Sequence, residues 1–400
     1  MFELHYVRET KAENVVEKVK KSAGIEPSLA VFFLTGSLNK EPEKVRLNCD
    51  SIGVPVEAVM TPEGIWSTGA LVLITDSEVS IQTFTGTASE VCQKLRRAEK
   101  GNFNLLIYPL FFIKSRFFML KNLMKLKRAS LEEASKVFEE MFYPMNAILR
   151  PFRDEEKTAI ALNVFPLKFG IGTPKISLNG RVLGRKVLSV SFEEKVDCDF
   201  ADTFPRRGKS FEETAEILSN ELVNVKKVSV LKRGIAIGGI DGMSVRDFLR
   251  EQRITMRANL ENDVRRSEFF GATPYVICMI SRETHGSSAL GLMDYDLKFY
   301  PSLFDTEVFY EEALFAGEFI RGGIKRVIEK LRESDFAILD QNLMLMFEER
   351  TVEIAKAFGG YGIFTSYPSY TGKLGKDFMS EVEERICVNT WGTIAFLNLE

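Results

Sequence analysis

Short apolar runs alternate along the chain with segments whose apolar residues recur at helical spacing. Residues 29–35 form the run Leu-Ala-Val-Phe-Phe-Leu-Thr, which is typical of a strand buried on both faces. Residues 13–22 place Val15, Val16 and Val19 on one side of a helix. The pattern therefore predicts a mixture of helices and strands over the whole chain.

The same criteria predict the remaining elements. Further strands are expected at 54–60, 70–75, 79–84, 104–108, 158–165, 186–192, 228–231, 235–240, 275–280, 336–339 and 386–399. Helices are expected at 41–49, 90–98, 131–141, 210–223, 245–252, 318–330 and 349–358. Between residues 175 and 183, Asn179-Gly180 suits the type I′ turn of a β-hairpin. Because hairpins interrupt the alternation of strands and helices, we expect mixed or antiparallel sheets rather than a doubly wound parallel sheet.

Two stretches share an order of elements. Residues 29–75 and residues 336–399 each contain a strand, a helix, a strand, a glycine-containing turn and a strand. The likeness lies in this order and not in residue identity, so it is compatible with duplication and with chance. We expect an α/β (α+β) fold of two layered lobes, residues 1–200 and 201–400, with mixed or antiparallel sheets.

Composition and charge exclude several classes of protein. Apolar residues make up 45% of the chain, which is far above the disordered range. The 53 Lys and Arg residues against 56 Asp and Glu leave a net charge of −3, which argues against nucleic acid as the main partner. No apolar run is long enough to span a bilayer, and the first residues lack a secretory signal pattern, so we expect a cytoplasmic protein.

Metal and cofactor motifs are sparse. The five cysteines lie far apart without a Cys-x-x-Cys pair, and only two histidines occur, so neither a disulfide framework nor a zinc site is indicated. No glycine-rich segment has the dinucleotide-binding spacing. Gly208-Lys209-Ser210 resembles the end of a phosphate-binding loop, but Thr203 occupies the position where that motif requires its first glycine. We therefore expect no cofactor, no bound metal and no assigned catalytic residue.

Basic residues precede the helix expected to begin at Ser210. Arg206, Arg207 and Lys209 would meet the free N–H groups and the positive dipole end of that helix, an arrangement that favours an anion. A solvated basic turn that caps the helix is the alternative.

An enzymatic alternative rests on one polar region. His285 follows the strand expected at 275–280, and Asp294 and Asp296 lie on one side of an extended segment. These residue types suit a metal-assisted or Ser/His hydrolase, although no G-x-S-x-G motif positions a serine.

Residues 111–128 are basic and aromatic, without one acidic residue. A helix of this kind can lie on an anionic membrane or hold single-stranded nucleic acid. Its Phe, Leu and Met residues at helical spacing are also typical of core packing or of a subunit contact. An interaction or scaffold protein that uses this stretch is a third functional hypothesis.

Several short motifs together resemble the FIST family of sensory domains, in divergent form. They lie at residues 29–34, 56–65, 169–172, 178–182, 239–245 and 388–397. The resemblance implies paired N- and C-terminal parts that bind a small ligand and pass the bound state to a signalling partner, without catalysis.

The combined expectation is a ligand-binding sensory protein that holds a small polar or anionic metabolite in a polar gap between its lobes. Lobe interfaces are common ligand sites. Homo-oligomerisation stays open. The expected contacts are Thr61, Glu63 and Gly64 in the first turn, Arg206, Arg207 and Lys209 in the basic loop, and Asp340, Gln341, Asn342, Ser369, Tyr370 and Thr371 at the ends of C-terminal strands.

Overall fold

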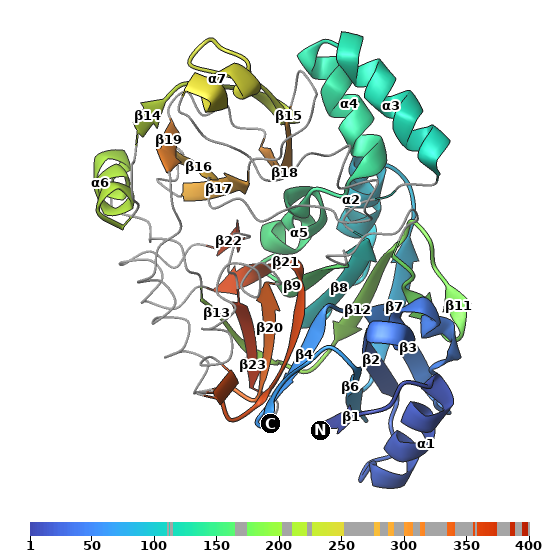
Figure 1. Cartoon of the computed structure of the whole chain (residues 1–400). Helices are drawn as coiled ribbons and strands as arrows, with labels where there is room; N and C mark the ends of the chain where they lie inside the picture. The colour runs from blue at the N-terminus through green and yellow to red at the C-terminus, as the bar shows by residue number, and fades with distance from the viewer. Residues whose placement is uncertain are drawn as a thin grey trace.

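The structure is a computed structural model of the chain. It describes residues 1–109, 112, 115–164, 174–201, 210–221, 226–251, 276–280, 287–291, 300–306, 313–316, 334–340, 355–356, 358–373, 385–388 and 394–398. In Figure 1 the sheets built from the first half and the last part of the chain lie below, and the described strands between residues 226 and 316 lie above them.

Three copies of one four-strand unit make up the lower sheets, and we call them repeats 1, 2 and 3. Repeat 1 contains β1 (Phe2–Val7), β2 (Leu29–Thr35), β3 (Asp50–Pro55) and β6 (Gly69–Thr75). Repeat 2 contains β7 (Val79–Phe84), β8 (Phe103–Pro109), β9 (Thr158–Val164) and β12 (Val187–Phe192). Repeat 3 contains β13 (Asp197–Ala201), β20 (Phe336–Asp340), β21 (Tyr361–Lys373) and β23 (Ile394–Asn398).

Strand pairing is the same in the three repeats. The second strand pairs in parallel with the third and antiparallel with the fourth. The first strand pairs antiparallel with the fourth. Each sheet therefore mixes parallel and antiparallel pairs, as expected from the hairpins in the sequence.

Hairpins connect the repeats in a closed ring. The hairpin of β4 (Ala58–Thr61) and β5 (Gly64–Trp66) in repeat 1 pairs with β21 of repeat 3. The hairpin of β10 (Ser177–Leu178) and β11 (Arg181–Val182) in repeat 2 pairs with β3 of repeat 1. The later part of β21 forms a hairpin with β22 (Arg385–Val388) and pairs with β9 of repeat 2. Each repeat thus covers the edge of the third strand of another repeat, which would otherwise be open to pairing with another chain.

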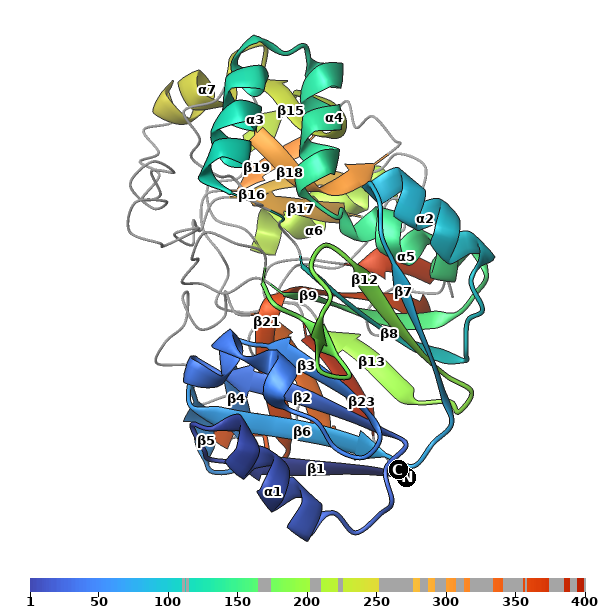
Figure 2. The same cartoon turned by 90° about the vertical axis from the view of Figure 1, so that its right-hand side faces the viewer.

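The helices of the first two repeats are α1 (Ala12–Ser22), α2 (Ala88–Arg97), α3 (Arg116–Arg128), α4 (Leu131–Met141) and α5 (Met145–Asp154). Among these helices, α1, α2 and α5 pack on the sheets, whereas α3 and α4 lie farther out. Val15 and Val19 of α1 are fully buried against repeat 1, as Figure 2 shows for the helix and its sheet. None of the helices among the described residues has the length and apolar character that crossing a bilayer requires.

The helix predicted at 41–49 is wrong. The short 3₁₀ turn η1 (Gly36–Lys40) precedes that segment, which contains a second one, η2 (Pro42–Lys44), and no α-helix before β3 begins at Asp50. Ser51 Oγ accepts a hydrogen bond from the Leu47 amide at 3.0 Å and donates to the Cys49 carbonyl at 3.0 Å. These local bonds compete with a helical ladder and hold the chain in a turn.

A separate segment is inserted into repeat 3, between β13 and β20. It contains α6 (Phe211–Glu221), β14 (Lys226–Val228), β15 (Val230–Ile240), α7 (Val245–Glu251), β16 (Val276–Ile280), β17 (Ser287–Gly291), β18 (Tyr300–Thr306) and β19 (Ala313–Ala316). The described strands pair in the order β14-β19-β16-β17 and as β15-β18. The helices α4 and α5 of repeat 2 contact this insertion through β15 and β18.

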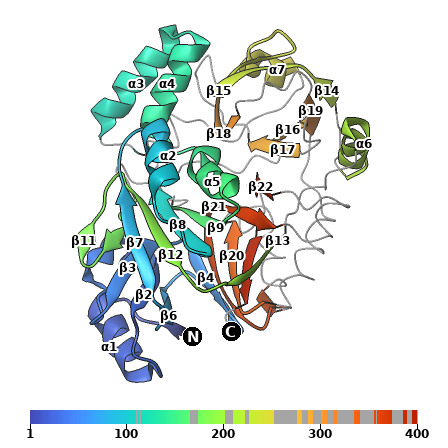
Figure 3. The same cartoon turned by 180° about the vertical axis from the view of Figure 1, so that it is seen from behind.

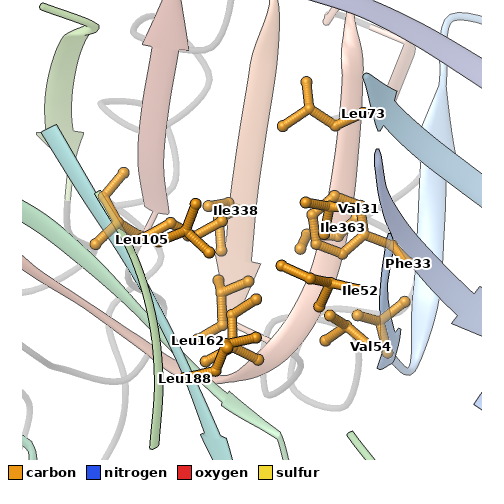
Figure 4. Close-up of a cluster of buried hydrophobic side chains, with 14 of the residues drawn as sticks. Val31, Phe33, Ile52, Val54, Leu73, Leu105, Leu162, Leu188, Ile338 and Ile363 are labelled. Carbon is orange, nitrogen blue, oxygen red and sulfur yellow. The ribbon is translucent and has the colours of Figure 1, made fainter. Parts of the chain in front are cut away.

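One apolar core lies between the three sheets. Val31, Leu105 and Ile338 come from the second strands of the three repeats, and all are at most 4% exposed. Figure 4 shows these side chains converging. The Phe33 and Phe336 rings stack with centroids 5.7 Å apart, which joins repeat 1 directly to repeat 3.

The centre of this core is dry. A cavity of about 20 Å³ is lined only by apolar residues, among them Phe33, Phe103 and Phe336. A space of this size and character does not retain water. Among the described residues this interface therefore contains no polar gap, and polar groups that could hold a ligand have to lie at the ends of the strands.

The expected α+β class with mixed and antiparallel sheets is confirmed. The two stretches that look alike in sequence do share a strand order, and residues 79–192 form a third copy that the pattern did not reveal. The division of the chain at 200/201 stays a prediction. Strand pairing connects the two sides of that division, because β9 pairs with β21.

The shared core predicts a large cost for truncating Phe33, which is 1% exposed. We expect Phe33→Ala to lower the free energy of unfolding by about 3–5 kcal/mol, measured by chemical denaturation. Phe117→Ala is the matched control, because Phe117 is 76% exposed and its loss should change stability by no more than about 0.5 kcal/mol. Equal effects of the two substitutions would contradict the assigned core.

Candidate functional site

The predicted contacts in the first turn hold that turn together. Thr61 Oγ1 accepts hydrogen bonds from the Glu63 amide at 3.2 Å and from Trp66 Nε1 at 3.0 Å. Gly64 pairs with Thr61 across the hairpin. The Thr61 hydroxyl is thus occupied within the β4–β5 hairpin, and a ligand role for these residues gains no support from its geometry.

Several predicted residues lie outside the described ranges. They are Arg206, Arg207, Lys209, Gln341 and Asn342 of the ligand hypothesis and His285, Asp294 and Asp296 of the hydrolase hypothesis. Both the basic loop and the hydrolase alternative therefore stay predictions.

The C-terminal strand ends contain a buried polar group, which we call the Asp340 cluster. Its members are Asn163 of β9, Asp340 of β20, and Thr365, Ser369 and Thr371 of β21, each at most 2% exposed. Asp340 is the register partner of Thr365. Thr365 Oγ1 donates to the Asn163 carbonyl at 2.8 Å, and Asn163 Nδ2 lies 3.5 Å from Ser369 Oγ.

A break in strand register brings these residues together. The pairing of β21 with β20 ends at Thr365, and the pairing with β9 begins at Ser366 and shifts its register before Ser369. Pro368 lies within the break, where a residue without an N–H is tolerated. The carboxyl ends of β9 and β20 therefore meet at one place, although they belong to different repeats.

The cluster extends over both faces of the sheet. Tyr370 is a buried member of the central apolar core, so its ring packs there, and its predicted role as a ligand contact stays a prediction. Ser369 and Thr371 flank Tyr370 and face the opposite side, where α5 covers β21. Thr371 Oγ1 is buried and meets no hydrogen-bond partner within the described part of the chain.

The repeats show that the polarity at Asp340 is specific to repeat 3. By register, the position of Asp340 corresponds to Phe33 in repeat 1 and to Ile107 in repeat 2. Its partner Thr365 corresponds in the same way to Val54 and Leu162. All four counterparts are buried members of the apolar core. Burial of a carboxylate and a hydroxyl costs stability unless they are hydrogen-bonded or paired, so apolar residues are the ordinary choice at such positions.

The chemistry of the cluster suits hydrogen bonding to a polar molecule. It offers one carboxylate, three hydroxyls and one amide. Among the described residues no group of three or more His, Cys, Asp or Glu side chains is placed to hold a metal ion.

A second polar place is a surface hollow of about 410 Å³, lined by Arg46, Leu47, Asn48, Cys49, Asp50 and Asn179. Its polar groups serve the junction of repeats 1 and 2. Asn179 accepts from the Ser51 amide at 2.8 Å and donates to Asp50 at 2.7 Å. Burial raises the pKa of the Cys49 thiol, so this thiol is protonated at neutral pH and a poor nucleophile.

The same junction confirms the predicted hairpin. Asn179 and Gly180 both have positive φ, at 50° and 78°, as a type I′ turn requires. Its side-chain bonds anchor the hairpin to β3, which is a structural role.

Sequence reasoning found Asp340, Ser369 and Thr371 but missed Asn163 and Thr365. Asn163 is a polar residue within the apolar run at 159–165, and Thr365 directly follows the apolar residues Ile363 and Phe364. The pairing of β9 with β21 that makes them neighbours leaves no local trace in the sequence.

Two buried threonines test the difference between structural and unused hydroxyls. Thr35 Oγ1 donates to the Gly69 carbonyl at 2.8 Å, so Thr35→Val should lower the free energy of unfolding by about 1–3 kcal/mol. Thr371→Val removes a hydroxyl without such a bond and should leave stability unchanged or raise it by about 1 kcal/mol. Chemical denaturation without added ligand measures both, and equal losses would show that Thr371 supports the fold.

Comparison with known proteins identifies relatives of the chain. The family model for the AF0772-like protein C-terminal domain matches residues 212–321. This range begins in α6 and ends after β19, so it covers the insertion in repeat 3. An uncharacterised protein of Archaeoglobus fulgidus is 47% identical over 349 residues, which are 86% of this chain and 100% of the relative. No solved structure matches.

The resemblance to the FIST family was wrong, because the family that matches is a different one. The motif at residues 178–182 is short and is set by the turn geometry of the hairpin at Asn179. Such motifs recur in unrelated β-rich folds. The chain belongs to the family of the Archaeoglobus fulgidus protein and contains an AF0772-like C-terminal domain.

Proposed function

We propose that the protein is a small-molecule-binding protein of the cytoplasm that holds a polar ligand at the Asp340 cluster. The observation that carries the proposal is the polarity of Asp340 and Thr365 at positions that are apolar in both other repeats. Positions that depart from the rule of a repeated core are expected at functional sites.

The ligand expected here carries hydrogen-bond donors. A carboxylate only accepts hydrogen bonds, so Asp340 selects a hydroxyl or ammonium group. Thr365 Oγ1, the register neighbour of Asp340, donates its proton to the Asn163 carbonyl and can still accept a hydrogen bond from the same group. Binding of an anionic part would need the basic residues 206, 207 and 209, which lie outside the described ranges.

The surroundings of the cluster suit a sensory role without catalysis. The helix α5 contacts β9, β21 and β22 at the cluster and also contacts β18 of the insertion. Pro151 lies inside α5 and interrupts its hydrogen-bond ladder, which makes the helix a place where movement can be absorbed. A ligand that shifts α5 would change the position of the insertion and thereby the surface that a partner protein could contact.

A thermal-shift screen of the full chain against sugars, polyols, amino acids and nucleosides tests the proposal. A ligand at about 100 times its Kd should stabilise the protein by about 2.7 kcal/mol. Asp340→Asn should weaken binding of that ligand by at least about tenfold, since it removes a charge-assisted hydrogen bond.

Asp50→Asn is the matched control, because Asp50 is exposed and lies in the other polar place. It should leave the ligand-induced shift unchanged. An equal shift in wild type and Asp340→Asn would exclude the Asp340 cluster as the binding site.

A further inference from the structure

The helix α3 exposes a stripe of apolar side chains. Phe117, Leu120 and Met124 are 76%, 56% and 63% exposed. They lie at positions i, i+3 and i+7, which share one side of a helix. Single exposed apolar residues are ordinary, but three of them on one helical face call for a partner.

Basic residues accompany the stripe. Lys121, Lys125 and Arg128 are exposed on the same helix. The helix α3 contains five Lys and Arg residues and no acidic residue. The other residues of the chain carry 48 Lys and Arg against 56 Asp and Glu, which is a net charge of −8. Positive charge is thus concentrated on α3 within a protein that is otherwise acidic.

The exposed stripe is separate from the face by which α3 is attached. Asn122 and Leu126 are each 1% exposed and lie on the other side of the helix. The helix α3 contacts α4, and α4 contacts β15. Figures 1 and 3 both place α3 at the outer edge of the molecule, beyond α4. Core packing therefore explains the buried side of α3 and does not account for its exposed side.

We propose that α3 docks the protein on the surface of an anionic lipid bilayer. Phe117, Leu120 and Met124 would enter the boundary between headgroups and acyl chains. Lys121, Lys125 and Arg128 would lie at the level of the lipid phosphates. At 13 residues the helix is roughly 20 Å long, which suits lying on a bilayer and is too short to span one.

Charge and side-chain type favour this occupant over two others. A second copy docked through its own α3 would bring two strongly basic helices together, which repels. Single-stranded nucleic acid is held by stacking on aromatic rings, and only Phe117 of the three exposed apolar side chains is aromatic.

Co-sedimentation of the full chain with vesicles tests the proposal. We expect binding to vesicles of phosphatidylcholine mixed with an equal amount of phosphatidylglycerol, little binding to phosphatidylcholine alone, and weaker binding at high salt. Lys121→Glu/Lys125→Glu should reduce binding by at least about tenfold. Phe117→Ser should also reduce binding, without a change in charge.

Lys136→Glu is the matched control, because this lysine is exposed on the neighbouring helix α4 and its reversal should leave binding unchanged. All substituted side chains are exposed, so a thermal melt should match wild type, and Phe117→Ser decides the matter if the charge reversal unfolds the protein. Absence of wild-type binding to anionic vesicles would overturn the proposal. So would a fall in mass by light scattering on Phe117→Ser, which would assign the face to self-association, or binding of single-stranded RNA in place of vesicles.

Discussion

Burial of one apolar core between three sheets is the interaction on which the rest of the structure depends. Val31 of repeat 1, Leu105 of repeat 2 and Ile338 of repeat 3 lie in this core with their neighbours. The strands of one repeat alone do not enclose the core. The exchanged hairpins bind each repeat to another at the edge of a strand. The body therefore has to form as a unit, with pairs as distant in sequence as Met60 and Gly362 in register.

The core positions that are apolar in repeats 1 and 2 are polar at one place in repeat 3. At the level of Phe33 and Ile107, repeat 3 has Asp340, beside Thr365 where the other repeats have Val54 and Leu162. The register break in β21 adds Ser369 and Thr371 from the same strand and Asn163 from a different repeat. The polar cluster thus occupies the place where two repeats and the helix α5 meet, and α5 connects it to the AF0772-like insertion.

Much of the fold could be predicted from the chain, because apolar runs of four to seven residues mark buried strands directly. The likeness of residues 29–75 and 336–399 was visible because each stretch is short and both contain their strands in the same order. The third copy was not visible, since three helices separate β8 from β9. The helix expected at 41–49 failed because Ser51 and Pro42 favour turns there. The exchange of hairpins depends on long-range pairing, so Asn163 and Thr365 could not be assigned to the site, whereas Asp340, Ser369 and Thr371 could.

We infer that the Asp340 cluster binds a small polar molecule. The most direct test is an experimental structure of the full chain with the ligand that the thermal-shift screen identifies. We expect density for the ligand within hydrogen-bonding distance of the Asp340 carboxylate. Density for the ligand only in the surface hollow beside Asp50 and Asn179, or at another place away from Asp340, would contradict this assignment.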